Sequence, residues 1–181
     1  GINSADSITV DAHKWLNVPY DAAMQFTKHK TLQWKVFQNS AAYLSDPSLS
    51  EDYFHYTPEN SRRFRALPSW FTLMAYGKEG YREIVERNCD AARHFGELIK
   101  SSAGFKLLAQ VRMNVVCFTL NEETTSQETI RKFLQSVRDD GRVYFTPTVF
   151  KGTPAIRAAI SNWLTKKEDV ELGFEVLNGL Q

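Results

Sequence analysis

Near the start of the chain, short apolar runs are separated by polar turn residues, and this pattern favours strands over helices. Residues 8–10 form one short apolar strand and residues 22–27 the next. The residues between them form turns and show no helical period, so we expect a local antiparallel pair at the edge of a larger sheet. Apolar positions at Leu32, Val36 and Phe37 then indicate a short helix, or a loosely packed loop, over residues 28–37.

The regular pattern stops over residues 38–61. Serines and prolines are frequent there, and the interspersed aromatic residues follow neither a helical nor a strand period. A loop of this length in a compact protein is usually a lid or a binding loop, and disorder is the competing interpretation. We expect a helix after it, beginning near Leu67 with Pro68 in its first turn and ending at Gly77.

The second part of the chain alternates helices and strands. Residues 78–101 carry a helical stripe of apolar positions, and strands are expected at 105–110, 114–120, 143–149 and 155–160. Two helices follow their own capping boxes, Thr125-x-x-Glu128 and Thr165-x-x-Glu168. Their inward positions are expected to be Ile130, Phe133, Leu134 and Val137 in the first, and Val170, Phe174 and Leu177 in the second. This order predicts a small α/β lobe.

Composition narrows the class of partner. The chain has 22 Lys+Arg against 21 Asp+Glu, a net charge of +1, so neither nucleic acid nor an anionic membrane is an expected partner. No apolar run approaches the roughly 20 residues that span a bilayer, and the start lacks a signal-peptide pattern, so we expect a soluble, cytoplasmic protein. Cys89 and Cys117 are expected as buried, reduced thiols, and no histidine or cysteine has the spacing of a metal site.

Lys14 is the main candidate for chemistry. It stands in the polar turn after the strand at 8–10, between a histidine and a tryptophan. A lysine in a partly apolar setting loses its preference for the ammonium form, so its amine becomes a nucleophile toward a carbonyl. That is the requirement for a Schiff base. A solvated surface charge is the alternative interpretation.

The segment Asp11-Ala12-His13-Lys14-Trp15-Leu16, with Ala5-Asp6-Ser7 before it, resembles the lysine segment of the group II pyridoxal-phosphate amino acid decarboxylases. The resemblance implies that Lys14 carries pyridoxal 5′-phosphate and that His13 reaches its phosphate; a hydrogen-bonded structural histidine is the alternative. Asp11 departs from the family, in which many members have asparagine. An ionised aspartate would repel a phosphate, so Asp11 is expected either to point elsewhere or to be protonated.

Three later segments resemble the same family, in the same order. Ala41-Ala42-Tyr43-Leu44 resembles the mobile catalytic loop, Arg62-Arg63-Phe64-Arg65-Ala66-Leu67 resembles an R-R-F-R-S-L segment, and Ile156-Arg157-Ala158-Ala159-Ile160-Ser161-Asn162 resembles the R-x-x-I-S-N of glutamate decarboxylases. The resemblance implies that Tyr43 donates the proton after decarboxylation and that Arg157 binds the substrate α-carboxylate. A surface-packing tyrosine and a surface or core-edge arginine are the alternatives. The three arginines of the second segment are interpreted as salt-bridging loop anchors, not as an RNA contact.

The resemblance implies the C-terminal portion of a fold-type I pyridoxal-phosphate enzyme, with an α/β fold. Residues 1–77 would end the large cofactor-binding domain, with the catalytic loop at about 38–61, and residues 78–181 would form the small C-terminal α/β domain with its connecting helix. The implied reaction is decarboxylation of an L-amino acid to its amine and CO₂, in a homodimer that includes a preceding N-terminal part; the isolated chain is expected to be inactive. An aldehyde synthase or aminotransferase relative, and a cofactor-free interaction or structural fragment, stay open. The substrate amino acid is not predicted.

Overall fold

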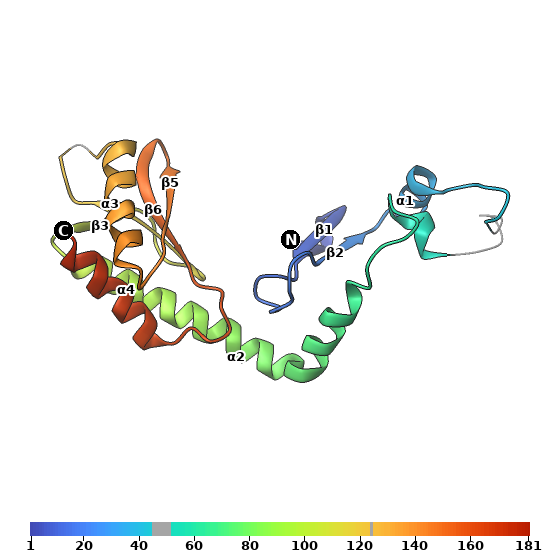
Figure 1. Ribbon diagram of the computed structural model, residues 1–181, viewed down its shortest axis with the longest axis horizontal. Coiled ribbons are helices and arrows are strands. Elements are labelled where there is room, and N and C mark those ends of the chain that lie inside the picture. The colour runs from blue at the N-terminus through green and yellow to red at the C-terminus, as the bar shows by residue number, and fades with distance from the viewer. Residues whose placement is uncertain (45–51, 124) are drawn as a thin grey trace. The chain divides into compact units, whose positions relative to one another are not determined.

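The computed structural model describes residues 1–44, 52–123 and 125–181 (Figure 1). The chain divides into two compact units, Gly1–Gly77 and Lys78–Gln181. Residues 45–51, which belong to the predicted catalytic loop, lie outside the described residues. Within the described part, no helix is both long enough and apolar enough to cross a membrane.

The first unit is built on a two-stranded antiparallel sheet. A 3₁₀ turn, η1 (Ile2–Ser4), precedes β1 (Ser7–Asp11), which pairs along its whole length with β2 (Ala23–Thr27). The predicted pair of strands is therefore confirmed. The connection between the strands packs on itself through a small buried cluster, which consists of Ala12, Val18, Ala22 and the partly buried Leu16.

Two short helical segments complete the described part of this unit before its last helix. α1 (Lys30–Phe37) confirms the helical alternative for residues 28–37, and none of its residues is buried. η2 (Tyr53–Tyr56) is a 3₁₀ turn inside the region expected to be loop, and it contacts α1. One of its side chains, that of His55, is fully buried.

A long helix, α2 (Ala66–Ser101), runs through the boundary between the units. It bends at Gly77, whose φ of 58° and ψ of −171° are not helical. Glycine tolerates this left-handed backbone because it has no Cβ. The two helices predicted on either side of Gly77 are thus confirmed as helical segments, joined through one residue instead of a loop. In the second segment Ile84, Ala92, Phe95 and Ile99 are buried, as the apolar stripe predicted.

The second unit contains a four-stranded antiparallel sheet in the order β3-β4-β6-β5. Its strands are β3 (Phe105–Leu107), β4 (Val115–Leu120), β5 (Thr146–Phe150) and β6 (Thr153–Ala159). Lys151 and Gly152 both have positive φ, 48° and 83°, and form a two-residue hairpin turn between β5 and β6. All four predicted strands exist, but β5 begins three residues later than expected and β6 two residues earlier.

The capping residues of the last two helices differ from the prediction. α3 (Gln127–Asp140) is capped by Ser126, whose hydroxyl accepts a hydrogen bond from the Thr129 amide, whereas Thr125 donates to a strand carbonyl. α4 (Lys167–Gly179) starts after Lys166, whose amide donates to Asp169. Both predicted boxes named residues one position too early, because several polar residues are adjacent at each start and only the backbone conformation selects the cap.

One hydrophobic core lies between the sheet and the helices of the second unit. Four phenylalanines form its centre, with ring centroids 5.7 to 6.3 Å apart: Phe95, Phe105, Phe118 and Phe145. α3 packs on β5 and β6 and contacts α4, and Figure 1 shows these helices together on one side of the sheet. Side chains of β6 alternate, so Ile156 and Ala158 enter this core while Arg157 points to the other face and is exposed.

Candidate active site

The predicted catalytic lysine lies in a short loop that closes on its own backbone. The Ala12 amide donates to the Ala22 carbonyl over 3.0 Å, the Asn17 amide to the Lys14 carbonyl over 3.0 Å, and the Val18 amide to the Ala12 carbonyl over 3.1 Å. Asn17 has a φ of 54°, a conformation that asparagine tolerates better than most residues. Its side-chain amide donates to the Tyr76 hydroxyl over 3.1 Å. The loop after β1 therefore presents Lys14 from a backbone held at several points.

Lys14 is paired with Asp11. The Lys14 Nζ lies 2.5 Å from Asp11 Oδ2, and the two side chains are 61% and 40% exposed. This hydrogen bond and the positive charge of Lys14 lower the pKa of the Asp11 carboxyl below its ordinary value. The lowered pKa favours an ionised Asp11 over the protonated alternative, and the exposed amine of Lys14 agrees with the solvated alternative for that residue. Asp11 thus takes the alternative in which it points elsewhere, toward the amine.

The ring of His13 is fixed by two contacts. Its Nδ1 lies 3.4 Å from the Ala22 carbonyl oxygen, and the ring stacks on Tyr20 with centroids 4.0 Å apart. Because a carbonyl can only accept, Nδ1 carries the proton in this arrangement. The other nitrogen, Nε2, can then donate to an anion only when the imidazole is positively charged.

Tyr43 lies in a turn after α1, in which the Leu44 amide donates to the Ala41 carbonyl over 2.9 Å. Its side chain is 83% exposed, so in this structure it is not packed against the described part of the surface. The phenol is therefore available to a ligand, but no described contact places it beside Lys14.

The arginines of the R-R-F-R segment form an ion-pair network. Arg63 and Arg65 both pair with Asp21, which follows the lysine loop, and Arg65 also pairs with Glu59. Hydrogen bonding and the two guanidinium groups hold the pKa of Asp21 below its ordinary value. Arg62 lies 4.0 Å from Glu59. The prediction of salt-bridging anchors is confirmed, because the network ties the approach to α2 to the segment just after Lys14.

Arg157 lies on β6, a central strand of the second unit, where it pairs with Cys117 of β4 and Thr146 of β5. Its guanidinium has no ion-pair partner among the residues described. An exposed, unpaired guanidinium on a rigid strand has the planar pair of donors that a carboxylate requires. Burial raises the pKa of the neighbouring Cys117 thiol, and Arg157 lowers it by a smaller amount.

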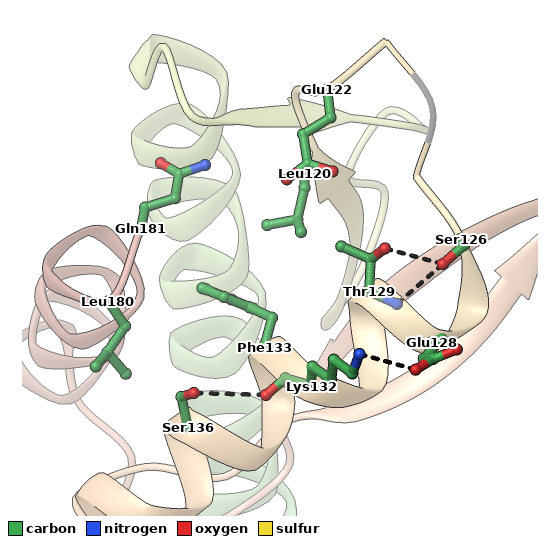
Figure 2. Close-up of a pocket in the computed structure, with 10 residues that line it drawn as sticks. All are labelled: Leu120, Glu122, Ser126, Glu128, Thr129, Lys132, Phe133, Ser136, Leu180 and Gln181. Carbon is green, nitrogen blue, oxygen red and sulfur yellow. Dashed lines mark hydrogen bonds and ion pairs between the residues drawn. The ribbon is translucent and has the colours of Figure 1, made fainter.

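A hollow of about 570 Å³ also lies in the second unit, between the start of α3 and the chain end (Figure 2). Four of its polar side chains are paired with one another: Lys132 with Glu128 over 2.8 Å, and Ser126 with Thr129 over 2.8 Å. It contains none of the predicted site residues. Over the described ranges no cluster of His, Cys, Asp and Glu could hold a metal ion.

The predicted site residues are divided between the units. Lys14, His13 and Tyr43 belong to the first unit, and Arg157 belongs to the second. Two features were not predicted from the sequence: the pairing of Asp11 with Lys14, and the burial of His55. The first has a sequence signal, because an acid three residues before a lysine can reach it across one turn. The second has none, because His55 is one of several ring residues in a stretch without a period.

The residues present fit a cofactor that is held through an amine. Lys14 offers an accessible amine on a fixed loop, and His13 beside it is a group that could meet a phosphate. Asp11 fits the amine and not the phosphate, since its charge would oppose a phosphate oxygen. A lysine amine on a fixed loop is the group through which enzymes of the pyridoxal-phosphate class hold their cofactor.

The comparison with known families agrees with this class. The sequence matches the family described as "Pyridoxal-dependent decarboxylase conserved domain" over residues 1–121. The chain therefore belongs to the pyridoxal-dependent decarboxylase family, and the family predicted from the lysine segment and its later motifs is confirmed. Pyridoxal phosphate, expected as the cofactor, is confirmed as the cofactor of this family.

The relatives include a protein named as a decarboxylase and one named as an aldehyde synthase, the two kinds of relative considered from the sequence. The aromatic-L-amino-acid decarboxylase of Drosophila melanogaster is 32% identical over 177 residues, which are 97% of this chain and 34% of that protein. The phenylacetaldehyde synthase of Petunia hybrida is 30% identical over 192 residues, which are 98% of this chain and 38% of that protein. The chain thus spans little more than a third of the length of the relatives it matches.

Solved structures show the same fold. The tryptophan decarboxylase of Catharanthus roseus, in complex with L-tryptophan, matches with a TM-score of 0.85 at 24% identity, over 99% of this chain and 37% of that one. This confirms the predicted fold, a portion of a fold-type I pyridoxal-phosphate enzyme.

Proposed function

We propose that this chain is the C-terminal portion of an enzyme that decarboxylates an L-amino acid with pyridoxal phosphate. The observation that carries the proposal is the position of Lys14, an accessible amine on a loop fixed by three backbone hydrogen bonds directly after a strand. The family's lysine segment and the tyrosine 29 residues beyond it support the same function. Aromatic L-amino acids are the first substrates to test, because the decarboxylase relatives carry that name.

Each candidate residue has a separate task in this proposal. Bound pyridoxal phosphate supplies an electron sink for the electron pair that stays on Cα when the bond to the carboxylate breaks and CO₂ leaves. Lys14 would hold the cofactor covalently, and Asp11 would keep the amine close when it is released. A positively charged His13 would donate to a phosphate oxygen. Arg157 would hold the α-carboxylate, and Tyr43 would deliver a proton to Cα.

The main competing reaction is oxidative deamination. It is considered because one of the relatives is named phenylacetaldehyde synthase. In that reaction the amino acid, O₂ and water give an aldehyde, CO₂, ammonia and hydrogen peroxide. A phenol at Tyr43 supports simple decarboxylation, because prompt protonation of Cα competes with oxygen; positioned acids of this kind are typically worth about 10²- to 10⁴-fold. An aminotransferase would also require Lys14 to hold the cofactor, but it would not require a proton from Tyr43. A cofactor-free interaction or structural module would require neither residue.

The first experiment tests the cofactor lysine in the complete enzyme, of which this chain is a portion. Lys14→Ala should abolish the visible band of covalently held cofactor and the mass increase after borohydride reduction. Lys35→Ala, which changes an exposed lysine of α1, is the matched control and should retain both. A cofactor-modified peptide that persists in Lys14→Ala would overturn the assignment.

The second experiment tests the reaction through Tyr43. With a panel of L-amino acids, the complete enzyme should release an amine and CO₂, and Tyr43→Phe should reduce amine formation and increase aldehyde and peroxide. Tyr53→Phe removes the hydroxyl of another exposed tyrosine, 88% exposed, and should behave as the parent enzyme. Equal product ratios in Tyr43→Phe and the parent would rule out a proton from Tyr43.

The proposal also covers domains, assembly and location. Residues 1–77 would be the end of the cofactor-binding domain and 78–181 the small C-terminal domain. A homodimer is supported by exposed apolar side chains on the first segment of α2, where Trp70, Phe71 and Met74 are 54%, 57% and 67% exposed. A cytoplasmic location is supported by two cysteines that form no disulfide. Light scattering on the complete enzyme and fractionation of the source cells test these two points.

A further inference from the structure

We propose that His55 is a positioning residue for Tyr43, because its buried imidazole fixes the base of the segment that carries the tyrosine. This inference rests on the proposed function of Tyr43. His55 is fully buried in η2, although its neighbour Tyr53 is 88% exposed. Its Nδ1 accepts a hydrogen bond from the Asn39 amide over 3.2 Å. The bond joins two points of the chain that lie on either side of Tyr43.

Asn39 is the second residue after the end of α1, and the chain continues from it to Tyr43. The Gln38 amide still donates to the Trp34 carbonyl over 2.7 Å, and this bond closes the last turn of the helix. The next amide, that of Asn39, cannot continue the helix and uses His55 instead. Tyr43 follows four residues later, so the direction in which the chain leaves α1 is set at the imidazole.

Two further hydrogen bonds hold the same base. Asn39 Nδ2 donates to Asn60 Oδ1 over 2.8 Å, and Gln33 Nε2 donates to the Tyr56 carbonyl over 2.8 Å. Both connect α1 and its end with the chain after Tyr43. The imidazole is the buried member of this set, so it is the contact that water cannot replace.

The chemistry of the ring explains why an imidazole is needed. Because Nδ1 accepts, the proton of the neutral ring lies on Nε2. Nε2 is buried and has no hydrogen-bond partner among the described residues. An apolar side chain would fill the same space without a buried, unpaired donor. What the imidazole adds at this position is the acceptor for Asn39.

The test uses the complete, pyridoxal-phosphate-loaded enzyme and three variants. His55→Phe keeps a ring but removes the acceptor, and His55→Asn returns an acceptor oxygen close to the place of Nδ1. His29→Asn changes an exposed histidine, bonded to Asp6 at 3.1 Å, and serves as the matched control. The readouts are kcat, KM, the ratio of aldehyde to amine, and the visible band of the bound cofactor.

We expect His55→Phe to keep the cofactor band and to have a KM within about twofold of the parent value. Its kcat should be lowered by roughly 10- to 100-fold, because a displacement of the Tyr43 hydroxyl by about 1 Å has effects of this size. The aldehyde share should rise, as is also expected for Tyr43→Phe. His55→Asn should recover at least about half of the lost kcat on a logarithmic scale, and His29→Asn should match the parent. Unchanged kcat in His55→Phe, or no recovery in His55→Asn, overturns the proposal.

A second measurement does not depend on the variants. Hydrogen exchange of the parent enzyme should show the Asn39 amide strongly protected, in contrast to the amide of Ser40 beside it. If His55→Phe does not fold, a rapidly exchanging Asn39 amide overturns the proposal and a protected one supports it. If the parent releases no amine from any amino acid, the proposed function fails, while the exchange result still decides whether His55 fixes this base.

Discussion

Substitution of Phe118 tests how strongly the hydrophobic core of the second unit stabilises β6, the strand that carries Arg157. Phe118 is fully buried on β4, contacts Phe95, Phe105 and Phe145, and stands opposite Ile156, the residue before Arg157. Replacing a fully buried phenylalanine by alanine lowers the free energy of unfolding by about 3–5 kcal/mol. A unit that spans residues 78–181 has a free energy of unfolding of roughly 5–15 kcal/mol, at 0.05–0.15 kcal/mol per residue.

Hydrogen exchange followed by mass spectrometry of the complete enzyme measures this effect locally. Each 1.4 kcal/mol changes an equilibrium constant about tenfold. Amides of β4 and β6 that exchange through opening of the unit should therefore exchange roughly 10²- to 4 × 10³-fold faster in Phe118→Ala. Phe26→Ala, at a 56% exposed position of β2, makes the same chemical change and should alter exchange by less than about threefold. Unchanged exchange in β4 and β6 of Phe118→Ala would refute the reasoning.

Three further predictions concern the candidate site. Lys14→Met should raise the pKa of Asp11 toward its ordinary value, because Lys14 is the largest cause of the lowered pKa. In the parent, the ion pair stabilises the fold above the ordinary pKa of aspartate, and this stabilisation is lost as the pH falls through the lowered pKa of Asp11. An NMR titration of the Asp11 carboxyl measures the change. Arg157→Lys should lower kcat/KM by about tenfold or more, since lysine loses the bidentate geometry, whereas exposed Arg138→Lys should not. Asn17→Ala should destabilise the lysine loop by about 1 kcal/mol more than Asn17→Gly, because its φ is positive; faster exchange of the loop amides in Asn17→Gly than in Asn17→Ala would contradict this.

The sequence was most informative where one face of an element is buried. Ile130, Leu134 and Val137 were expected inward from their spacing alone, and all three are buried. The same logic located the second segment of α2, since burial on one face of a helix imposes a period that can be counted. Caps carry no such period. Thr125 and Ser126 are chemically equivalent candidates, and the choice between them depends on backbone angles that the sequence does not state.

Gly77 illustrates a different limit. The residue was correctly interpreted as the end of a helical segment, because glycine favours a left-handed conformation at such positions. The helix resumes at once, since the following residues carry a strong apolar stripe of their own that packs in the second unit. A single glycine therefore marks a bend within α2, and propensity alone does not separate a bend from an ending.

The lysine segment shows how a correct residue can be chosen for an incomplete physical reason. Apolar surroundings were expected to make Lys14 nucleophilic, yet its amine is exposed and beside an ionised Asp11. The amine of Lys14 is held in an ion pair with this carboxylate, so it becomes available to a carbonyl only when the pair separates. Asp11 is then a group that a bound cofactor must displace from Lys14, and the unusual aspartate of this segment acts on the amine and not on the phosphate. This is why the Asp11 titration in Lys14→Met is informative: a pKa that stays low without Lys14 would place the origin of the depression in another group of the site.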